Sequence, residues 1–292
     1  MKEQQRIAYA YLLLTFFLWG SLYVVSKFVL GKLPTFAVAF GRYLIGYLAL
    51  TVIVSQKPKE TIARKDYGYI FIIGFLGYSI SVGMQLMGTK LAGPSLASLL
   101  NSTNPITISI MAALILKERL TWPKIAGLVL SLWGVYLIIG NAAGVNIAGV
   151  ILSFGSVILW SFMSVITRKV TRSYNPVTIT RAAMGITVVS NLLICILELC
   201  VTSQPVEMDL MVFLGLCYIG IFCTALTLVL WNKSLSMLDA SVCSAFYPVQ
   251  TLTSSALGIL FLHETAGWPF FAGSALIIVG VLVSLLVKGK NC

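Results

Sequence analysis

The side chains with the clearest potential for chemistry lie inside an apolar stretch at 95–115. Ser98, Asn101 and Asn104 occur there, and Pro105 follows them. Polar groups within apolar spans are energetically costly, so they often mark the path of a solute. Pro105 cannot donate a backbone hydrogen bond, which frees a carbonyl one turn earlier and kinks a helix. The pattern predicts a kinked, polar helix that contacts a solute; bonding between neighbouring helices is the alternative role of the hydroxyls.

A second apolar stretch, at 242–262, repeats this arrangement. Ser241, Ser244 and Pro248 have the i, i+3, i+7 spacing of the first stretch, and Tyr247 adds an aromatic hydroxyl next to the proline. We therefore expect the two prolines to be flexible points in two helices that move.

Aromatic and amide side chains elsewhere could complete the walls of a cavity. Trp19 and Trp160 lie away from the ends of their apolar stretches, although tryptophan prefers the membrane interface. Aromatic walls with a few polar groups suit an organic ligand, and ordinary helix packing is the alternative. The side chains that we expect to contact a solute are Trp19, Tyr78, Gln85, Asn101, Trp160, Ser164, Tyr218 and Tyr247.

Two arginines, Arg42 and Arg181, lie a short distance inside apolar stretches. An arginine there can extend its guanidinium to lipid head groups, which would be a structural role. The functional alternative is to anchor a carboxylate or phosphate, or to form an ion pair that changes between conformations.

Residues suited to catalysis or metal binding are scarce. His263 is the single histidine, and the six cysteines form no CxxC pattern. The sequence has no P-loop or HExxH pattern, and no acidic residue lies in the middle of the first six apolar stretches; Glu198 lies at the edge of a later one. We expect no enzymatic activity, no metal and no cofactor, and no proton coupling through a buried carboxylate.

Composition indicates the setting of these side chains. The 292 residues are 59% hydrophobic and 10% charged, whereas soluble domains are about one quarter charged. A membrane-spanning helix needs about 20 apolar residues. We therefore expect an all-α integral membrane protein with ten transmembrane helices, at 8–27, 36–54, 68–87, 95–115, 124–140, 148–167, 177–197, 210–231, 242–262 and 270–287.

The net charge of +11 is distributed unevenly among the connecting loops. Fifteen of the 20 basic residues lie in one set of alternating loops, three lie in the other set, and Arg42 and Arg181 lie inside spans. Cytoplasmic loops of membrane proteins carry such an excess. The asymmetry places both termini in the cytoplasm and accounts for the charge without a nucleic-acid partner.

A short sequence motif occurs twice in the chain, in ERLTWPKIAG at 118–127 and in ETAGWPFFAG at 264–273, which share glutamate, tryptophan, proline, alanine and glycine at the same spacing. The earlier polar stretches and the two tryptophans repeat at similar offsets. We expect two five-helix halves, 1–142 and 143–292, and an odd number of helices inverts the second half relative to the first. Inverted repeats are typical of secondary transporters, which bind solute near the midplane between the halves.

The same residues resemble a known family. LWGSLYVVSK (Leu18–Lys27), Pro34, Arg42 and the long segment Asn104–Val135 with its echo at Pro248–Val281 resemble the EamA-type branch of the drug/metabolite transporter superfamily. The resemblance implies ten helices with both termini inside and a central cavity lined mainly by the first, third, fourth, sixth, eighth and ninth spans. It also implies movement of amino acids, other small metabolites or drugs, commonly outward.

The sequence therefore predicts an alternating-access transporter in a bacterial inner or plasma membrane, which exports a small amino acid-like or drug-like solute. Its expected partners are that solute and membrane lipid, and we expect a monomer or a homodimer. A non-transporting scaffold or assembly protein, a lipid-acting membrane enzyme and a channel are the alternatives.

Overall fold

The fold is described from a computed structural model, which covers residues 2–54, 60–117, 122–141, 146–202, 206–244, 246–263 and 267–285. Every secondary-structure element in these ranges is a helix, so the all-α prediction is confirmed. Eight helical spans among the described residues are long and apolar enough to cross a membrane. The 20-residue helix α7 (Trp122–Asn141) and α14 (Trp268–Leu285) complete ten.

The first half contains five spans, of which the third and fourth are composite. The helices are α1 (Lys2–Leu30), α2 (Thr35–Val54), η1 (Arg64–Asp66), α3 (Tyr67–Phe71), the π-helix η2 (Ile72–Ser81), α4 (Val82–Ala92), α5 (Pro94–Asn101), α6 (Asn104–Leu116) and α7. The segment from η1 to α4 forms the third span, and α5 with α6 forms the fourth.

The second half also contains five spans, of which the third and fourth are composite. Its helices are α8 (Ile147–Val170), α9 (Pro176–Val201), α10 (Leu210–Gly220), the π-helix η3 (Ile221–Leu226), α11 (Thr227–Met237), α12 (Ala240–Ser244), α13 (Tyr247–Leu262) and α14. The segment from α10 to α11 forms the eighth span, and α12 with α13 forms the ninth.

Backbone irregularities occur at corresponding places in the two halves. The third and eighth spans each contain a π-helix. The fourth and ninth spans are each interrupted just before a helix with proline in its first turn, at Pro105 and Pro248. The helices after these breaks are followed directly by Lys117 and His263, which have left-handed backbones with φ of 58° and 51°. The kink predicted from Pro105 is thus observed as a break, because the proline has no N–H to continue the ladder.

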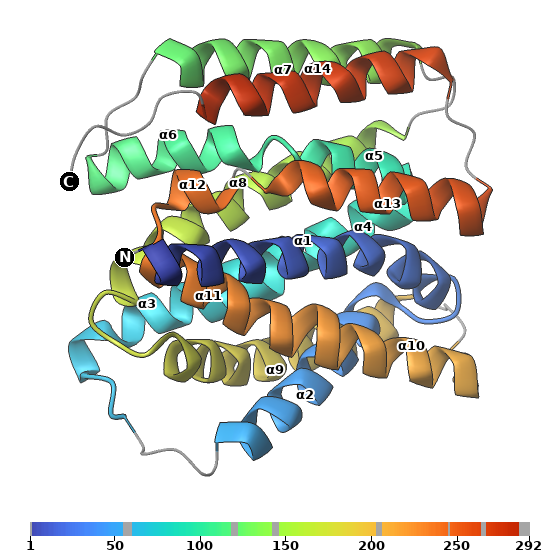
Figure 1. The fold of residues 1–292 in the computed structure, drawn as a ribbon. Helices are drawn as coiled ribbons and strands as arrows, with labels where there is room; N and C mark the ends of the chain where they lie inside the picture. Colours follow the sequence, from blue (N-terminus) through green and yellow to red (C-terminus); the bar gives the residue numbers. More distant parts are fainter. Residues whose placement is uncertain are drawn as a thin grey trace.

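The bundle is built around α1, which packs against α11 and α13. The helices α7 and α14 pack along each other at one edge (Figure 1), where Gly127, Gly134, Gly273 and Gly280 are buried. The first helix begins, and the last helix ends, at the same end of the bundle (Figure 1). We call this the inner end and the opposite end the outer end.

The backbone of α2 in the first half closely approaches the end of α10 in the second half. A Cβ atom on Gly46 would lie 2.8 Å from the Gly220 carbonyl oxygen, and one on Gly220 would lie 2.9 Å from the Arg42 carbonyl oxygen. Small residues allow backbones in membranes to approach this closely. The approach brings Arg42 against η3.

Candidate solute-binding cavity

A narrow cavity lies between the two halves. Its free volume is about 30 Å³, which is room for one water molecule or little more. It is lined by Trp19, Leu22, Arg42, Tyr43, Ser81, Val82, Gln85, Asn101, Ser156, Trp160, Leu228, Tyr247 and Gln250. These residues belong to the spans that the family resemblance implied, together with the second span, which contributes Arg42 and Tyr43.

Two tryptophans at corresponding positions of the halves meet at the cavity. The rings of Trp19 and Trp160 lie 5.5 Å apart in an edge-to-face arrangement, which is a favourable geometry for aromatic pairs. The Trp19 indole Nε1 donates a hydrogen bond to the carbonyl oxygen of Cys223, at 3.2 Å. Because Cys223 lies in the π-helix η3, this bond ties α1 of the first half to the irregular turn of the second.

A hydroxyl between two amides joins three spans beside the cavity. The amides of Gln85 and Gln250 donate to the Tyr23 hydroxyl oxygen at 2.5 and 3.3 Å. Tyr23 is buried, so its hydrogen bonds are made to protein groups. The two lining glutamines are therefore held in place from α1.

The breaks in the fourth and ninth spans are joined by hydroxyl contacts. Ser102 and Thr251 are hydrogen-bonded to each other, and the Thr251 hydroxyl also donates to the Ser98 carbonyl oxygen at 3.2 Å. The Asn101 amide donates to the Ala97 carbonyl oxygen at 3.1 Å. Asn101 lies at the cavity wall, and the hydroxyl contacts connect the broken region of the fourth span to the ninth span.

The most unusual group of the cavity is the Arg42 guanidinium. The residue is 3% exposed, and Nε donates to the Thr224 hydroxyl oxygen at 2.9 Å. The guanidinium carbon lies 5.4 Å from the centre of the Tyr43 ring, within the range of a cation–π contact. Nη1 is buried and has no hydrogen-bond partner in the described structure.

Some residues expected at the cavity lie beside it. Tyr78 is buried and accepts a hydrogen bond from Asn232 at 2.9 Å, whereas Ser164 donates to the Trp160 carbonyl oxygen at 2.8 Å. The Tyr218 hydroxyl lies 2.7 Å from the Ser21 hydroxyl. These three side chains are not among the lining residues.

Arg42 and Arg181, which the sequence suggested as a corresponding pair, lie in different pockets. Arg181 is half-buried and lines a separate pocket of about 600 Å³ near the inner end, together with Glu60 and Tyr47. Pro105 is buried at the start of α6. Pro248 lies in the first turn of α13, and its side chain is outside the described part.

The set expected from the sequence omitted seven lining residues, namely Leu22, Tyr43, Ser81, Val82, Ser156, Leu228 and Gln250. The third span explains part of this difference. Tyr78 and Gln85 are seven residues apart and would share a face of a regular α-helix. The π-helix η2 changes the rotation per residue, so Gln85 lines the cavity with Ser81 and Val82 instead of Tyr78.

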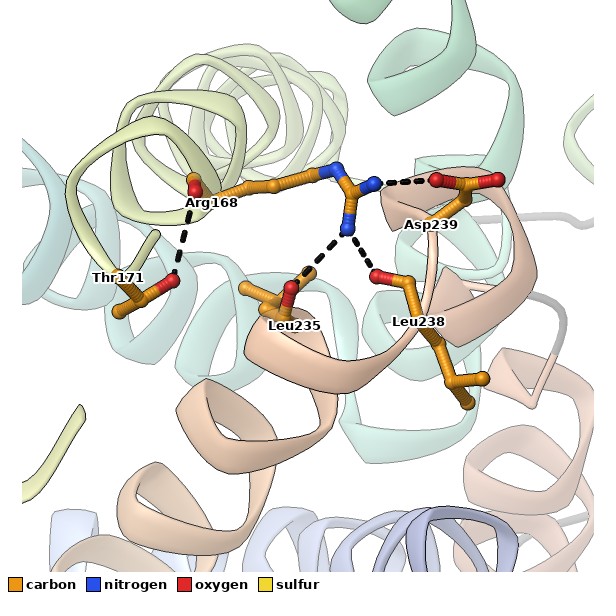
Figure 2. Close-up of polar contacts among 5 residues, drawn as sticks. All are labelled: Arg168, Thr171, Leu235, Leu238 and Asp239. Carbon is orange, nitrogen blue, oxygen red and sulfur yellow. Dashed lines mark hydrogen bonds and ion pairs between the residues drawn. The ribbon is translucent and has the colours of Figure 1, made fainter. Parts of the chain in front are cut away.

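Cationic side chains close the corners at both ends of the bundle. At the inner end, Arg168 of α8 donates to the carbonyl oxygens of Leu235 and Leu238 and pairs with Asp239 (Figure 2). At the outer end, Lys27 of α1 donates to the Lys90 carbonyl oxygen at 2.9 Å. Lys27 follows Trp19 by the same number of residues as Arg168 follows Trp160.

Glu198, which the sequence places at the edge of a span, has a structural role. Its two carboxylate oxygens accept the backbone N–H groups of Thr35 and Phe36, at 3.0 and 2.7 Å. These donors belong to the first turn of α2, where carboxylates are favourable. Glu118 and Glu264, which begin the two repeated segments, lie outside the described residues.

This architecture, with two similar halves around a cavity, agrees with the comparisons with known proteins. The model of the EamA-like transporter family matches residues 6–140 and 147–286, so the chain belongs to that family. An uncharacterized transporter of Archaeoglobus fulgidus is 27% identical over 93% of this chain and 96% of its own. The uncharacterized transporter YcxC of Bacillus subtilis is 28% identical, over 97% and 94% of the two chains.

A solved crystal structure has the same fold. It matches with a TM-score of 0.73 at 19% identity and covers 98% of this chain and 99% of that one. The family and these relatives identify the chain as a multi-pass membrane transporter protein of the EamA type.

Proposed function

We propose that the protein is a secondary transporter that exports a small organic solute by alternating access. The observation that carries this proposal is the cavity, which is lined by both halves and contains aromatic, amide and guanidinium groups. Such a mixture suits an organic ligand that is oriented by a few polar contacts. We place the protein in the plasma membrane with its inner end in the cytoplasm, because basic residues are concentrated in the loops at that end.

The backbone supplies places where the walls can move. Alternating access in inverted-repeat transporters involves helices that are interrupted near the binding site. The breaks before Pro105 and Pro248 and the π-helices η2 and η3 provide such interruptions in both halves. The cavity of about 30 Å³ is too narrow for an organic solute, so the walls must separate during the cycle.

The acidic groups favour a mechanism without a carboxylate proton carrier. Glu198 caps α2, and the described residues that line the cavity include no aspartate or glutamate. Facilitated diffusion or exchange of solutes is the mechanism that these groups support.

A scaffold or a lipid-acting enzyme fits the arrangement less well. A scaffold has no need for costly polar side chains around an interior cavity. A hydrolytic enzyme needs positioned acid and base groups, and none of the lining residues in the described part of the chain is a histidine, aspartate or glutamate.

The test is release of solutes from liposomes that contain the purified protein and a mixed pool of metabolites, followed by mass spectrometry. We expect selective, saturable release, and Asn101→Ala should reduce it by about 10-fold through loss of a polar contact. Ser164→Ala is the matched control, because that hydroxyl is bonded within its own helix. Absence of release by folded protein would contradict the transport proposal.

A further inference from the structure

We propose that the transported solute carries a single carboxylate group, which binds the guanidinium of Arg42. This inference rests on the proposed transport function and narrows it to a class of substrate. It is based on a buried cation without an anionic partner, at the wall of the cavity.

The Arg42 guanidinium lies at the cavity wall and forms no ion pair with a described residue. Its contacts in the described structure are the hydrogen bond to Thr224 and the face of the Tyr43 ring. A buried charge that lacks an opposite charge is strongly unfavourable. A neutral residue would pack there at lower cost, so the guanidinium points to a ligand that supplies the missing negative charge.

The surroundings hold the guanidinium in one orientation. Thr224 accepts from Nε, and its own hydroxyl donates to the Ile219 carbonyl oxygen at 2.8 Å within the π-helical region. Because Nε is occupied, the terminal nitrogens remain for a ligand, and buried Nη1 has no partner. Paired N–H groups of arginine match the two oxygens of a carboxylate.

The charge balance favours a carboxylate over a phosphate. Among the lining side chains that the structure describes, Arg42 is the one charged residue. A phosphate monoester carries a charge of about −1.5 to −2 at neutral pH, which would leave negative charge uncompensated in a buried site. A monocarboxylate is neutralised by one guanidinium, and its organic part would contact Trp19 and Trp160 while Asn101 and Gln250 contact its polar groups.

The first test uses liposomes that contain 3-phenylpropionate with its neutral amide, and a broader pool of matched organic acids and amides. We expect release of acids in preference to their amides. Arg42→Gln should reduce release of acids by about 100-fold, the scale for loss of one partner of a buried ion pair, and Arg42→Lys should retain part of it. Arg181→Gln is the matched control and should stay close to wild type, because Arg181 lies in another pocket.

Different results would overturn different proposals. Equal release of acids and amides, or undiminished release of acids by Arg42→Gln, would contradict the carboxylate assignment while transport stands. Release of phosphate esters alone would replace carboxylate with phosphate. No release at all by folded protein would contradict the transport function itself.

A second measurement needs no substrate. If Arg42 is kept for a ligand, replacing it by an apolar side chain of similar length removes an unfavourable buried charge. We expect Arg42→Met to raise Tm by about 3 °C, as substitutions at functional sites can do. A lower Tm would show that the guanidinium stabilises the fold, and would overturn the inference.

A different observation carries a second proposal: we infer that Lys27 and Arg168 hold two gates closed. We define the outer gate as the corner between α4 and α5, at Ala92–Pro94, and the inner gate as the corner between α11 and α12, at Leu238–Ala240. Each corner joins a span that contains a π-helix to a span that is broken at proline.

Each cation binds the carbonyl end of a span at its gate. Lys27 donates to the carbonyl oxygen of Lys90 near the end of α4. Arg168 donates to the carbonyl oxygens of Leu235 and Leu238 at the end of α11 and pairs with the carboxylate of Asp239 just before α12 (Figure 2). The carbonyls at a helix end lack partners in their own helix and attract cations. The two contacts close opposite ends of the bundle, in agreement with the narrow cavity.

Hydrogen–deuterium exchange of the purified protein tests this proposal. Arg168→Gln should increase exchange by about 10-fold in residues 235–244 and leave residues 88–101 unchanged, and Lys27→Gln should do the reverse. Arg172→Gln is the control, because Arg172 is exposed on the turn after α8. Equal exchange in wild type and variants, or loosening of both corners by each variant, would overturn the assignment of one gate to each cation.

Discussion

Arg42 and Arg181 occupy corresponding places in the two halves but have different surroundings. Arg42 is buried at the cavity between the halves, whereas Arg181 is half-buried beside Glu60 in a pocket near the inner end. The backbone irregularities, in contrast, occur in both halves. The comparison indicates that the repeat retains the means of bending while one half alone provides the charged group of the cavity.

The largest expected effect concerns the close approach that positions Arg42. Gly46→Ala should lower the free energy of unfolding by about 2–3 kcal/mol, because the new Cβ would overlap the Gly220 carbonyl oxygen. Gly68→Ala is the matched control, since a Cβ there meets nothing within 4 Å. Thermal unfolding in detergent compares the two variants. Equal effects would show that the two halves do not need this approach.

The two tryptophans test whether the halves contribute equally to the cavity wall. Trp19→Phe should cost about 1–2 kcal/mol, because it removes the hydrogen bond to the Cys223 carbonyl oxygen. Trp160→Phe should cost less, since that indole makes no such bond across to the other half in the described structure. The same thermal unfolding measures both. A larger loss for Trp160→Phe would reverse the comparison.

Lys117 and His263 should respond alike, because both have left-handed backbones at equivalent helix ends. Glycine adopts this conformation without the steric cost of a Cβ. Lys117→Gly and His263→Gly should each raise the free energy of unfolding by about 0.5–1 kcal/mol. Alanine at the same positions is the control and should give no gain. A gain in one half alone would show that the ends differ in their packing.

The smallest expected effect involves an exposed contact between the halves at the outer end. Asp209 pairs with Lys32, and the hydrogen bond from Lys32 lowers the pKa of the Asp209 carboxyl below its usual value. Stability from this pair is present above the usual pKa of about 4 and is lost as the pH falls through the lowered pKa. The pairing also raises the pKa of Lys32, so the contribution disappears again only when the pH rises through that raised pKa.

The pH dependence of Tm checks this pair. The difference between wild type and Lys32→Met should be small near neutral pH and vanish in acid, and 1 M salt should reduce it by screening. A difference that persists below the lowered carboxyl pKa would show that Lys32 acts by packing.

The sequence predicts the number of helices and the break in the fourth span well, for physical reasons. Apolar length decides whether a segment can cross a membrane, and Pro105 lacks the N–H that a helix needs. Trp19 and Trp160 could be paired because their neighbouring residues repeat.

Other features of the site depend on tertiary contacts. The π-helix η2 lies in a segment without proline, and its register decides that Ser81, instead of Tyr78, reaches the cavity. The different roles of Arg42 and Arg181 follow from how α2 and α9 pack, which a count of residues from each helix end does not show.

The π-helices also have a consequence for how this protein tolerates changes in length. A π turn contains about one residue more than an α turn, so deletion of one residue within η2 can be absorbed as ordinary α-helix. Because the residue that is lost is the surplus one, the residues after the deletion keep nearly the same orientation about the axis of the span, and Gln85 can keep its contact with the Tyr23 hydroxyl. Single-residue deletions in η2 should therefore give proteins that insert normally and retain the shape of the cavity. A deletion in the regular helix α9 has no surplus residue to absorb it and would rotate the residues after it by about 100°.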